Sequence, residues 1–395
     1  MAHTKSQDTA EPTGEAKPPA STTLTGIVDK PKGGDCRIRQ ISDGIIEGPE
    51  DPVVPHLILE EFNLRNAQEV TVEVVAKKPR RRRRSGGRKP RPTVERVVEI
   101  EGISPEEFSK RKPFEDLTPV DPAPRITLEH EGCPPACRLI DLFCPIGFGT
   151  RGLIVAPPKA GKTVLLQNIA NGIKVNHPDV ELIALLIDER PEEVTDFRRN
   201  VPAEVLASSN DMDTDTHCRL GMLTIERAKR RLEAGHDVVV LLDSITRLGR
   251  AFNNSRSFSQ SGRTMSGGLD SRAMEIPKQI FGGARRAEEG GSLTIIATCL
   301  VDTGSRADQV IFEEFKGTGN MELILDRTIA EKRLFPAINL AASGTRKEDL
   351  LLSERELKTI TALRRRLISM PPAVQVEQLL KAIERYPTNE HLVKG

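Results

Sequence analysis

The segment APPKAGKT, Ala156 to Thr163, holds the residues with the most chemical content. It lies between an apolar run and a stretch with helical periodicity, which is the context that a phosphate-binding loop requires. Gly161 would let backbone N–H groups close on phosphates, Lys162 would place a charge on the β and γ oxygens, and Thr163 would offer a hydroxyl to Mg²⁺. The sequence therefore predicts a site for a nucleoside triphosphate and Mg²⁺, although Ala156 stands where the general pattern has glycine.

Two acidic residues end other apolar runs. Asp243 closes VVVLLD, a pattern typical of the acid beside the Mg²⁺ of P-loop enzymes. Glu189 closes LLIDE in the same way. Because the carboxyl ends of parallel strands share one edge of a sheet, where ligands bind, we expect both near Lys162, with Glu189 polarising the attacking water. A solvated loop residue is the alternative interpretation of Glu189.

Basic residues on flexible loops could complete such a nucleotide site or bind nucleic acid beside it. SGTRKED (343–349) presents Arg346, which could act on the γ-phosphate of a neighbouring subunit, or simply form a surface salt bridge. SQSGRTMSGG (259–268) and DTGSRADQ (302–309) follow strands of the expected sheet and carry one arginine each. Such loops suit a grip on the backbone of single-stranded nucleic acid, although each alone could be an ordinary loop.

The elements that position these residues follow from the hydrophobic pattern. From about residue 125, apolar runs alternate with amphipathic segments of helical length, which predicts an α/β fold with a parallel sheet over 125–395. The last fifty residues predict a helical cap. The expected strands are 152–156, 182–187, 238–242, 293–300 and 321–325, and the expected helices are 162–174 and 216–233.

The first part of the chain has a different organisation. Residues 1–22 are polar and predict a disordered tail, and 104–124 reads as a linker. Within 23–103, short runs with turn signals predict a small OB-like barrel. Its expected strands are 24–28, 36–41, 53–59, 70–75 and 94–100. The barrel is interrupted by KKPRRRRRSGGRKPRP (77–92), whose ten basic residues predict a mobile cationic loop.

Composition limits the remaining choices. The 395 residues have a net charge of +1 and only 3% aromatic residues, and no apolar run is long enough to span a membrane. A soluble, cytoplasmic protein without a membrane partner is expected. Cys133, Cys137 and Cys144 raise the question of zinc, but their spacing is not that of a zinc ribbon and no fourth ligand stands at a normal distance. Reduced structural thiols are therefore favoured.

Long segments of the chain resemble the family of the bacterial transcription termination factor Rho. They are PIGFGTRGLIVAPPKAGKT, LLIDERPEEVT, VVVLLDSITRLGRA, GGSLTIIAT, EEFKGTGNMEL, AEKRLFPAI and SGTRKEDLL, between Pro145 and Leu351, with a weaker match at GPEDPVVPHLILEEFNLR. The resemblance implies a RecA-like core behind a cold-shock-like barrel, in a homohexameric, RNA-dependent ATPase and RNA–DNA helicase. Such a protein binds nascent single-stranded RNA and releases it from RNA polymerase.

The resemblance also assigns roles to individual residues. It implies that Glu189 activates water, that Lys162 acts on the phosphates, that Thr163 and Asp243 hold Mg²⁺, and that Arg346, assisted by Arg333, reaches into the next subunit. The residues implied to contact ATP are Gly147, Phe148, Gly149, Thr150, Arg151, Gly152, Lys159, Ala160, Gly161, Lys162, Thr163, Val164, Arg190 and Phe335. Those implied to contact RNA in the central pore are Arg263, Thr264, Met265, Ser266, Gly267, Gly268 and Arg306.

The barrel departs from the family pattern at its RNA site. Family members carry an aromatic pair that stacks bases, and a tyrosine on a nearby strand. Here Asp35 and Arg37 replace the pair, and Val53 stands in place of the tyrosine. Losing these rings should remove most base readout. We expect charge to replace stacking, through Arg37, Arg39 and the insertion that contains Arg82, with little preference for pyrimidines.

Two other function classes remain open at this point. A rotary-ATPase-like subunit shares a RecA-like core and an N-terminal β-barrel and would not use RNA, but the basic insertion and the two loop arginines disfavour it. A ring that binds RNA without hydrolysing ATP is the other class. The presence of Lys162, Glu189, Asp243 and Arg346 disfavours it.

Overall fold

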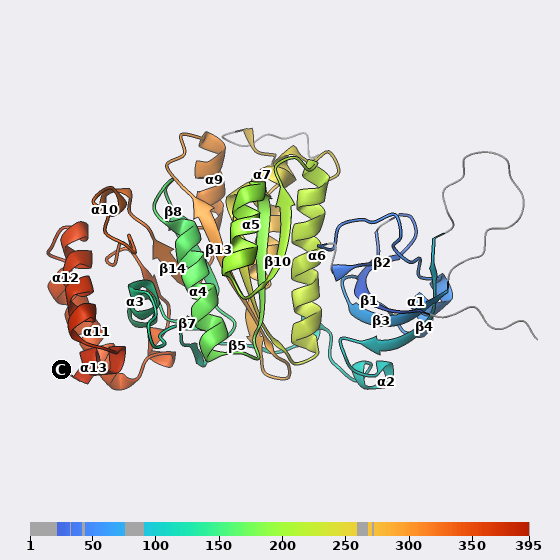
Figure 1. Cartoon of the computed structure of the whole chain (residues 1–395), viewed down its shortest axis with the longest axis horizontal. Coiled ribbons are helices and arrows are strands. Elements are labelled where there is room, and N and C mark those ends of the chain that lie inside the picture. The colour runs from blue at the N-terminus through green and yellow to red at the C-terminus, as the bar shows by residue number, and fades with distance from the viewer. Residues whose placement is uncertain are drawn as a thin grey trace, which may run out of the picture.

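The computed structural model of the chain describes residues 22–31, 33–41, 44–75, 91–258, 268–270 and 272–394 (Figure 1). The predicted tail, apart from residue 22, lies outside this part. So do the expected RNA contacts Arg82, Arg263, Thr264, Met265, Ser266 and Gly267. All statements about structure below concern the described residues.

The N-terminal part forms a small antiparallel sheet that closes on itself. Strands β1 (Thr22–Asp29), β2 (Arg37–Arg39), β3 (Glu69–Val75) and β4 (Thr93–Ile100) pair in the order β2-β1-β3-β4. Val53 bridges Arg37 of β2 and Thr93 of β4, which completes the barrel. A strand over 53–59 was expected, and that prediction is wrong beyond residue 53. Pro52 and Pro55 lack the N–H groups that a ladder needs, and helix α1 (His56–Glu61) begins after Pro55.

The second part is built on a parallel sheet in the order β10-β9-β11-β13-β8-β14, with β15 antiparallel at one edge. The strands are β8 Arg151–Ala156, β9 Glu181–Glu189, β10 Glu204–Ser209, β11 Asp237–Asp243, β13 Ser292–Leu300, β14 Met321–Ile324 and β15 Gly344–Thr345. Each expected strand is confirmed. Strand β10 was missed, because EVLASS is short and ends in two serines. The shorter strands are β5 Pro119–Val120, β6 Arg125–Ile126, β7 Ile146–Gly147 and β12 Arg285–Ala287.

Helices cover both faces of this sheet, as side-chain alternation along buried strands requires (Figure 1). On β9, Leu182, Ala184 and Leu186 pack into one apolar core and Ile183 and Leu185 into the other. The first core includes α3 Pro135–Phe143, α4 Lys162–Asn176, α5 Pro191–Asn200 and α10 Arg327–Glu331. The second includes α6 Thr214–Glu233, α7 Ile245–Asn254, α8 Glu275–Gly282 and α9 Arg306–Phe315. The predicted α/β fold is confirmed.

The predicted helical cap consists of α11 (Glu354–Leu367), α12 (Pro372–Arg385) and α13 (Asn389–Lys394), at the left of Figure 1. Short α2 (Pro105–Phe108) lies in the expected linker. In the described ranges, no helix is long and apolar enough to cross a membrane. The six cysteines are free, and the described residues include no cluster of three or more His, Cys, Asp or Glu side chains that could hold a metal ion.

Helix α6 stands between the sheet and the barrel (Figure 1). One side of α6 packs on the sheet, and the other side forms ion pairs with the barrel. Arg219 Nη2 lies 2.8 Å from Asp29 Oδ2, and Arg227 Nη2 lies 3.0 Å from Glu69 Oε2. Further along, Arg231 Nη1 lies 3.3 Å from Glu101 Oε2. The barrel and the motor sheet are thus joined by charged side chains spaced along one helix.

Candidate active site

The P-loop has the geometry that its sequence predicts. Strand β8 ends at Ala156, and α4 begins at Lys162. Gly161 caps the helix with φ 88°, a left-handed conformation that glycine adopts without strain, and Lys159 also has a positive φ of 64°. The N–H groups of the first turn of α4 therefore point into the loop, where an anion can accept from them.

Lys162 and Asp243 meet above the ends of β8 and β11. The Lys162 ammonium forms an ion pair with the Asp243 carboxylate, which is 2% exposed. Thr298 on β13, between these two strands, donates its hydroxyl to Asp243 Oδ1 at 2.8 Å. Sequence reasoning missed Thr298, since a threonine within a buried β run carries no distinctive signal. The P-loop lysine and the predicted metal-binding acid are therefore together, as expected.

Glu189 lies at the same edge, at the end of β9. It is 3% exposed, and its Oε1 lies 2.9 Å from Arg247 Nη1 and accepts from the backbone N–H of Arg190 at 3.1 Å. Burial, with help from the charge of Asp243, raises the pKa of Glu189 above its ordinary range, and Arg247 opposes that rise. This burial does not fit the alternative of a solvated loop residue.

Arg247 is a site residue that the sequence reasoning missed. It lies in the first turn of α7, where its backbone N–H donates to the side chain of the N-cap residue Ser244 at 3.2 Å. Its guanidinium contacts both Glu189 and the carbonyl oxygen of Asp188. The signal that could have found it is its position four residues after Asp243, where the first helical turn leads back over the sheet edge.

An apolar pocket of about 470 Å³ adjoins the P-loop. Phe335 forms part of its wall, is 45% exposed, and would lie 3.4 Å from a Cβ placed on Gly161. Val164 of α4 lines the same pocket and is 59% exposed. Its other lining residues are Pro134, Pro135, Ala136, Lys159, Ala160, Leu165, Asn168, Leu325, Pro336 and Ala337. A flat base can stack on Phe335 while its phosphates reach the loop.

The segment GFGTRG does not join this site within one chain. Gly147 to Gly152 lie at the start of β8, and the P-loop follows its end. The Phe148 ring contacts the ring of His177, the C-cap residue of α4, with centroids 5.5 Å apart. Since α4 has 15 residues, Phe148 and Lys162 lie at opposite ends of a helix about 22 Å long. The implied contact of 147–152 with ATP therefore cannot be made to the same chain's nucleotide.

The two arginines expected to act on a neighbouring subunit lie at opposite ends of the parallel strands. Arg346 follows β15, is exposed, and donates from Nη2 to the carbonyl oxygen of Gly317 at 3.0 Å, at the GFGTRG end. Arg333 is exposed, with φ 60°, two residues before Phe335 and therefore at the P-loop end. Arg190 is exposed at the N-cap of α5, at that end as well.

The expected pore contacts are described only in part. Arg306, the first residue of α9, and Gly268 are exposed. The segment 259–268 was expected to follow a strand, and instead it follows helix α7. Helices α7 and α9 are joined by Arg250, whose Nε donates to Asp308 Oδ1 at 2.6 Å. Figure 1 shows both helices at the end of the sheet where its parallel strands terminate.

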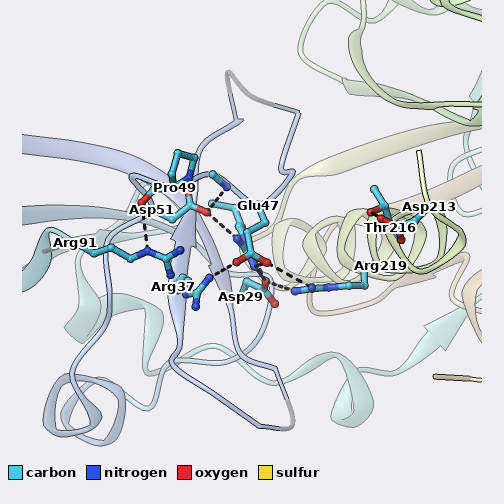
Figure 2. Close-up of polar contacts among 11 residues, drawn as sticks. Asp29, Arg37, Glu47, Pro49, Asp51, Arg91, Asp213, Thr216 and Arg219 are labelled. Carbon is cyan, nitrogen blue, oxygen red and sulfur yellow. Dashed lines mark hydrogen bonds and ion pairs between the residues drawn. The ribbon is translucent and has the colours of Figure 1, made fainter. Parts of the chain in front are cut away.

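In the barrel, Asp35 is exposed, but Arg37 and Arg39 are engaged with carboxylates. Figure 2 labels Arg37 and its partner Glu47. Arg37 forms an ion pair with Glu47. Arg39 is only 3% exposed and contacts Asp29 and Asp51, with Nη1 2.7 Å from Asp51 Oδ2. Contact of Arg39 with RNA was expected. Its burial in this network disfavours a contact of Arg39 with a phosphate.

The sequence has close relatives. Residues 136–345 match the nucleotide-binding domain of the ATP synthase alpha/beta family. The chain is 48% identical over 374 residues to a protein of Borreliella burgdorferi named transcription termination factor Rho, a match covering 94% of this chain and 70% of that protein. It is 47% identical over 370 residues to the protein of that name from Cereibacter sphaeroides, covering 90% and 85%.

Solved structures of lower identity share the fold. An ATPase from the type III secretion system of pathogenic bacteria superposes with a TM-score of 0.58 at 22% identity, over 78% of this chain and 93% of that chain. The secretion ATPase EscN of enteropathogenic E. coli superposes with a TM-score of 0.55 at 22% identity, over 77% and 67%. These likenesses establish the RecA-like fold, and the sequence relatives establish the family.

Proposed function

The chain belongs to the transcription termination factor Rho family, and on that premise we propose that it is an RNA-dependent ATPase and helicase. It would bind nascent RNA in the cytoplasm and use ATP hydrolysis to release that RNA from RNA polymerase. The observation that carries the proposal is the convergence of Lys162, Asp243 and Glu189 at one end of the parallel strands. The chain in which they meet is 48% identical to a relative named transcription termination factor Rho.

Each catalytic residue has a role that its surroundings support. Lys162 would leave Asp243 for the β and γ phosphates, and the first turn of α4 would add backbone donors. Thr163 and Asp243 fit a Mg²⁺ ion, because a hydroxyl and a carboxylate are oxygen ligands, and the ion would neutralise charge on the phosphates. Glu189, freed from Arg247 as the γ-phosphate arrives, would orient the attacking water.

A closed ring of identical copies, a homohexamer, supplies the missing half of the site. Arg346 and the P-loop lie at opposite ends of β8 and α4, so Arg346 cannot reach the nucleotide of its own chain. A head-to-tail interface places one end of each copy against the other end of the next, and it closes into a ring when the rotation allows. Arg346 would then act on the γ-phosphate of the adjacent copy.

RNA would be held at two places. Arg306, at the start of α9, lies at the P-loop end of the sheet, where a ring would present it to its pore. In the barrel, the Arg-rich insertion 77–92 would attract phosphates without reading bases. Arg37 could bind RNA together with this insertion only if its ion pair with Glu47 broke. This second site would be sensitive to salt and indifferent to sequence.

RNA-stimulated ATP hydrolysis tests the proposal. Turnover of the full chain is measured with Mg²⁺ and ATP, alone and with poly(C) or poly(A), beside Lys162→Ala as the inactive control. Stimulation by RNA is expected. A rate that RNA leaves unchanged would restore the rotary-ATPase alternative, which the Rho relatives disfavour, and no hydrolysis under any condition would support a non-catalytic ring.

A further inference from the structure

Three arginines lie side by side at the edge of the sheet opposite the P-loop. Arg151 begins β8 and Arg346 follows β15, and both flank Asn320 at the start of β14. The backbone N–H of Arg151 donates to Asn320 Oδ1 at 2.8 Å, and that of Arg346 donates to the Asn320 carbonyl oxygen at 2.7 Å. Arg285 begins β12, which pairs with β13, the other neighbour of β8. We call Arg346, Arg151 and Arg285 the arginine row.

The charges of the arginine row are not compensated. Within the described residues, none of the three forms an ion pair, whereas Arg219, Arg227 and Arg231 of α6 all do. Arg346 donates to a single carbonyl oxygen, that of Gly317. Arg285 lies over the Phe114 ring, 4.0 Å from its centroid. The Arg151 Nε is buried without any hydrogen-bond partner.

The three guanidinium groups also repel one another. Burial lowers the pKa of Arg151, and the charge of Arg346 lowers it further. Burial likewise lowers the pKa of Arg285, with a contribution from Arg151, while the exposed carboxylate of Glu115 opposes it. Partly buried like charges with a free donor are unfavourable unless an anion joins them. The arginine row therefore has the chemistry of an anion-binding surface.

We propose that Arg151 is a second arginine that acts in trans beside Arg346, binding the phosphates of the nucleotide held by the adjacent copy, with Arg285 adding positive potential behind it. This inference rests on the ring proposed above. It places one residue of GFGTRG in contact with a nucleotide, but with that of the neighbouring subunit and not with its own.

The anion that fits this surface is a triphosphate for two reasons. At the P-loop edge, which would face the arginine row, Asp243 and Glu189 are single carboxylates that Lys162 and Arg247 pair with before a nucleotide binds, and a bound triphosphate would bring more negative charge than either of them. The bound triphosphate is then the main negative charge at that edge. RNA is disfavoured, because Arg306, the described arginine among the expected pore contacts, lies at the P-loop end of the sheet.

Mixed rings provide the test. Copies carrying Arg151→Gln and copies carrying Lys162→Ala are co-expressed with different tags, and assemblies containing both are purified. Arg151→Gln alone is expected to lower ATP turnover by about 10- to 100-fold, the scale of losing one charged donor to a transition state. In mixed rings, one kind of interface has an intact P-loop facing an intact Arg151, so turnover should exceed that of either variant alone. A residue acting within its own chain gives no such recovery.

Controls separate this inference from the ring itself. Arg346→Gln is mixed with Lys162→Ala in the same way: recovery with Arg346→Gln but not with Arg151→Gln would overturn the role of Arg151 and leave the ring standing. If neither mixture recovers, both proposals fail. Arg365→Gln, at an exposed position on α11, is the matched variant and should leave turnover unchanged.

Two further readouts exclude a merely structural role. Mant-labelled AMPPNP should dissociate several-fold faster from Arg151→Gln rings than from the parent ring, and Arg151→Lys should restore most of the difference. The melting temperature of Arg151→Gln should not fall, because the guanidinium that it removes lacks a partner. A lower melting temperature with unchanged nucleotide dissociation would assign Arg151 to the fold alone and contradict the proposal.

Discussion

The P-loop edge of the motor sheet and the β2 face of the barrel use ion pairs in opposite ways. At the P-loop edge, Lys162 pairs with Asp243 and Arg247 pairs with Glu189, beside a loop whose first turn of helix leaves backbone donors for an incoming nucleotide. On the barrel, Arg37 pairs with Glu47 at a position where the resemblance implies a base-stacking ring, and Arg39, two residues on, pairs with Asp29 and Asp51.

This difference between the two regions indicates which ion pairs can open to bind a ligand. An ion pair beside a phosphate-binding loop loses little when a charged ligand takes the place of one partner. A fully buried network such as that of Arg39 stabilises the fold and loses much if one member leaves. We therefore assign the chemistry to the sheet edge and a structural role to the barrel network. The predictions below test that division, in order of expected effect.

The largest effect is expected at Glu189. Substitution Glu189→Gln keeps the size of the side chain and removes the charge that would polarise water, so turnover should fall by about 10³-fold. Binding of mant-ATP should persist, because the P-loop is intact. Turnover within twofold of the parent would refute the role of Glu189 and weaken the contrast between the two regions.

Arg39 should be the most sensitive position of the barrel. Arg39→Leu leaves Asp51 buried without its cation and Asp29 with Arg219 alone, which should cost about 3–5 kcal/mol in the free energy of unfolding. Urea denaturation followed by circular dichroism measures this loss. The control is Arg91→Gln, whose parent residue makes one hydrogen bond to the Pro49 carbonyl oxygen and should change stability by less than about 0.5 kcal/mol. Equal stability of the two variants would contradict a structural role for Arg39.

Substitution can restore the aromatic rings that the resemblance implies at positions 35 and 37. The double variant Asp35→Phe, Arg37→Phe should strengthen binding of poly(C), since each base stacked on an aromatic ring contributes about 1–3 kcal/mol. Filter binding at fixed salt compares this variant with Asp35→Leu, Arg37→Leu, which removes the same charges without adding rings. If the parent already binds poly(C) as tightly as the phenylalanine variant, base readout exists without rings and the comparison fails.

The smallest effect concerns pH. Glu189 must be ionised to orient water, and burial raises its pKa. Turnover should therefore decline as pH falls through a value above the ordinary glutamate pKa of about 4.3, at most tenfold per pH unit. A pH–rate profile of kcat at saturating ATP locates this limb. A rate that stays flat down to the ordinary glutamate range would show that Glu189 is not held in a buried site during turnover.

Much of the fold could be predicted because its signals are local. Strand β8, the loop and helix α4 follow from residues adjacent in sequence, as do the apolar strands that end at Glu189 and Asp243. The single-residue bridge at Val53 could not be predicted, since it depends on pairing with Arg37 and Thr93, which are distant in the chain. For the same reason β10 becomes a strand only beside β9.

The kind of site and its motif residues could be predicted from the sequence, but the spatial arrangement of the residues around it could not. Lys162 and Asp243 were identified from their motifs, whereas Arg247 and Thr298 join them only through the order of the strands. Spacing alone could not reveal that Arg346 and residues 147–152 lie about one helix length from their own P-loop. Nor could composition distinguish the buried Arg39 from an arginine that meets RNA.

We propose that the protein is an intact ATPase controlled by RNA, which its barrel holds through charge and not through base stacking. The direct measurement is ATP turnover against the concentration of poly(C) and of poly(A), over a series of salt concentrations. We predict stimulation by both polymers at similar concentrations, and a parallel loss of apparent affinity as salt rises. Stimulation by poly(C) alone that persists at high salt would contradict the account.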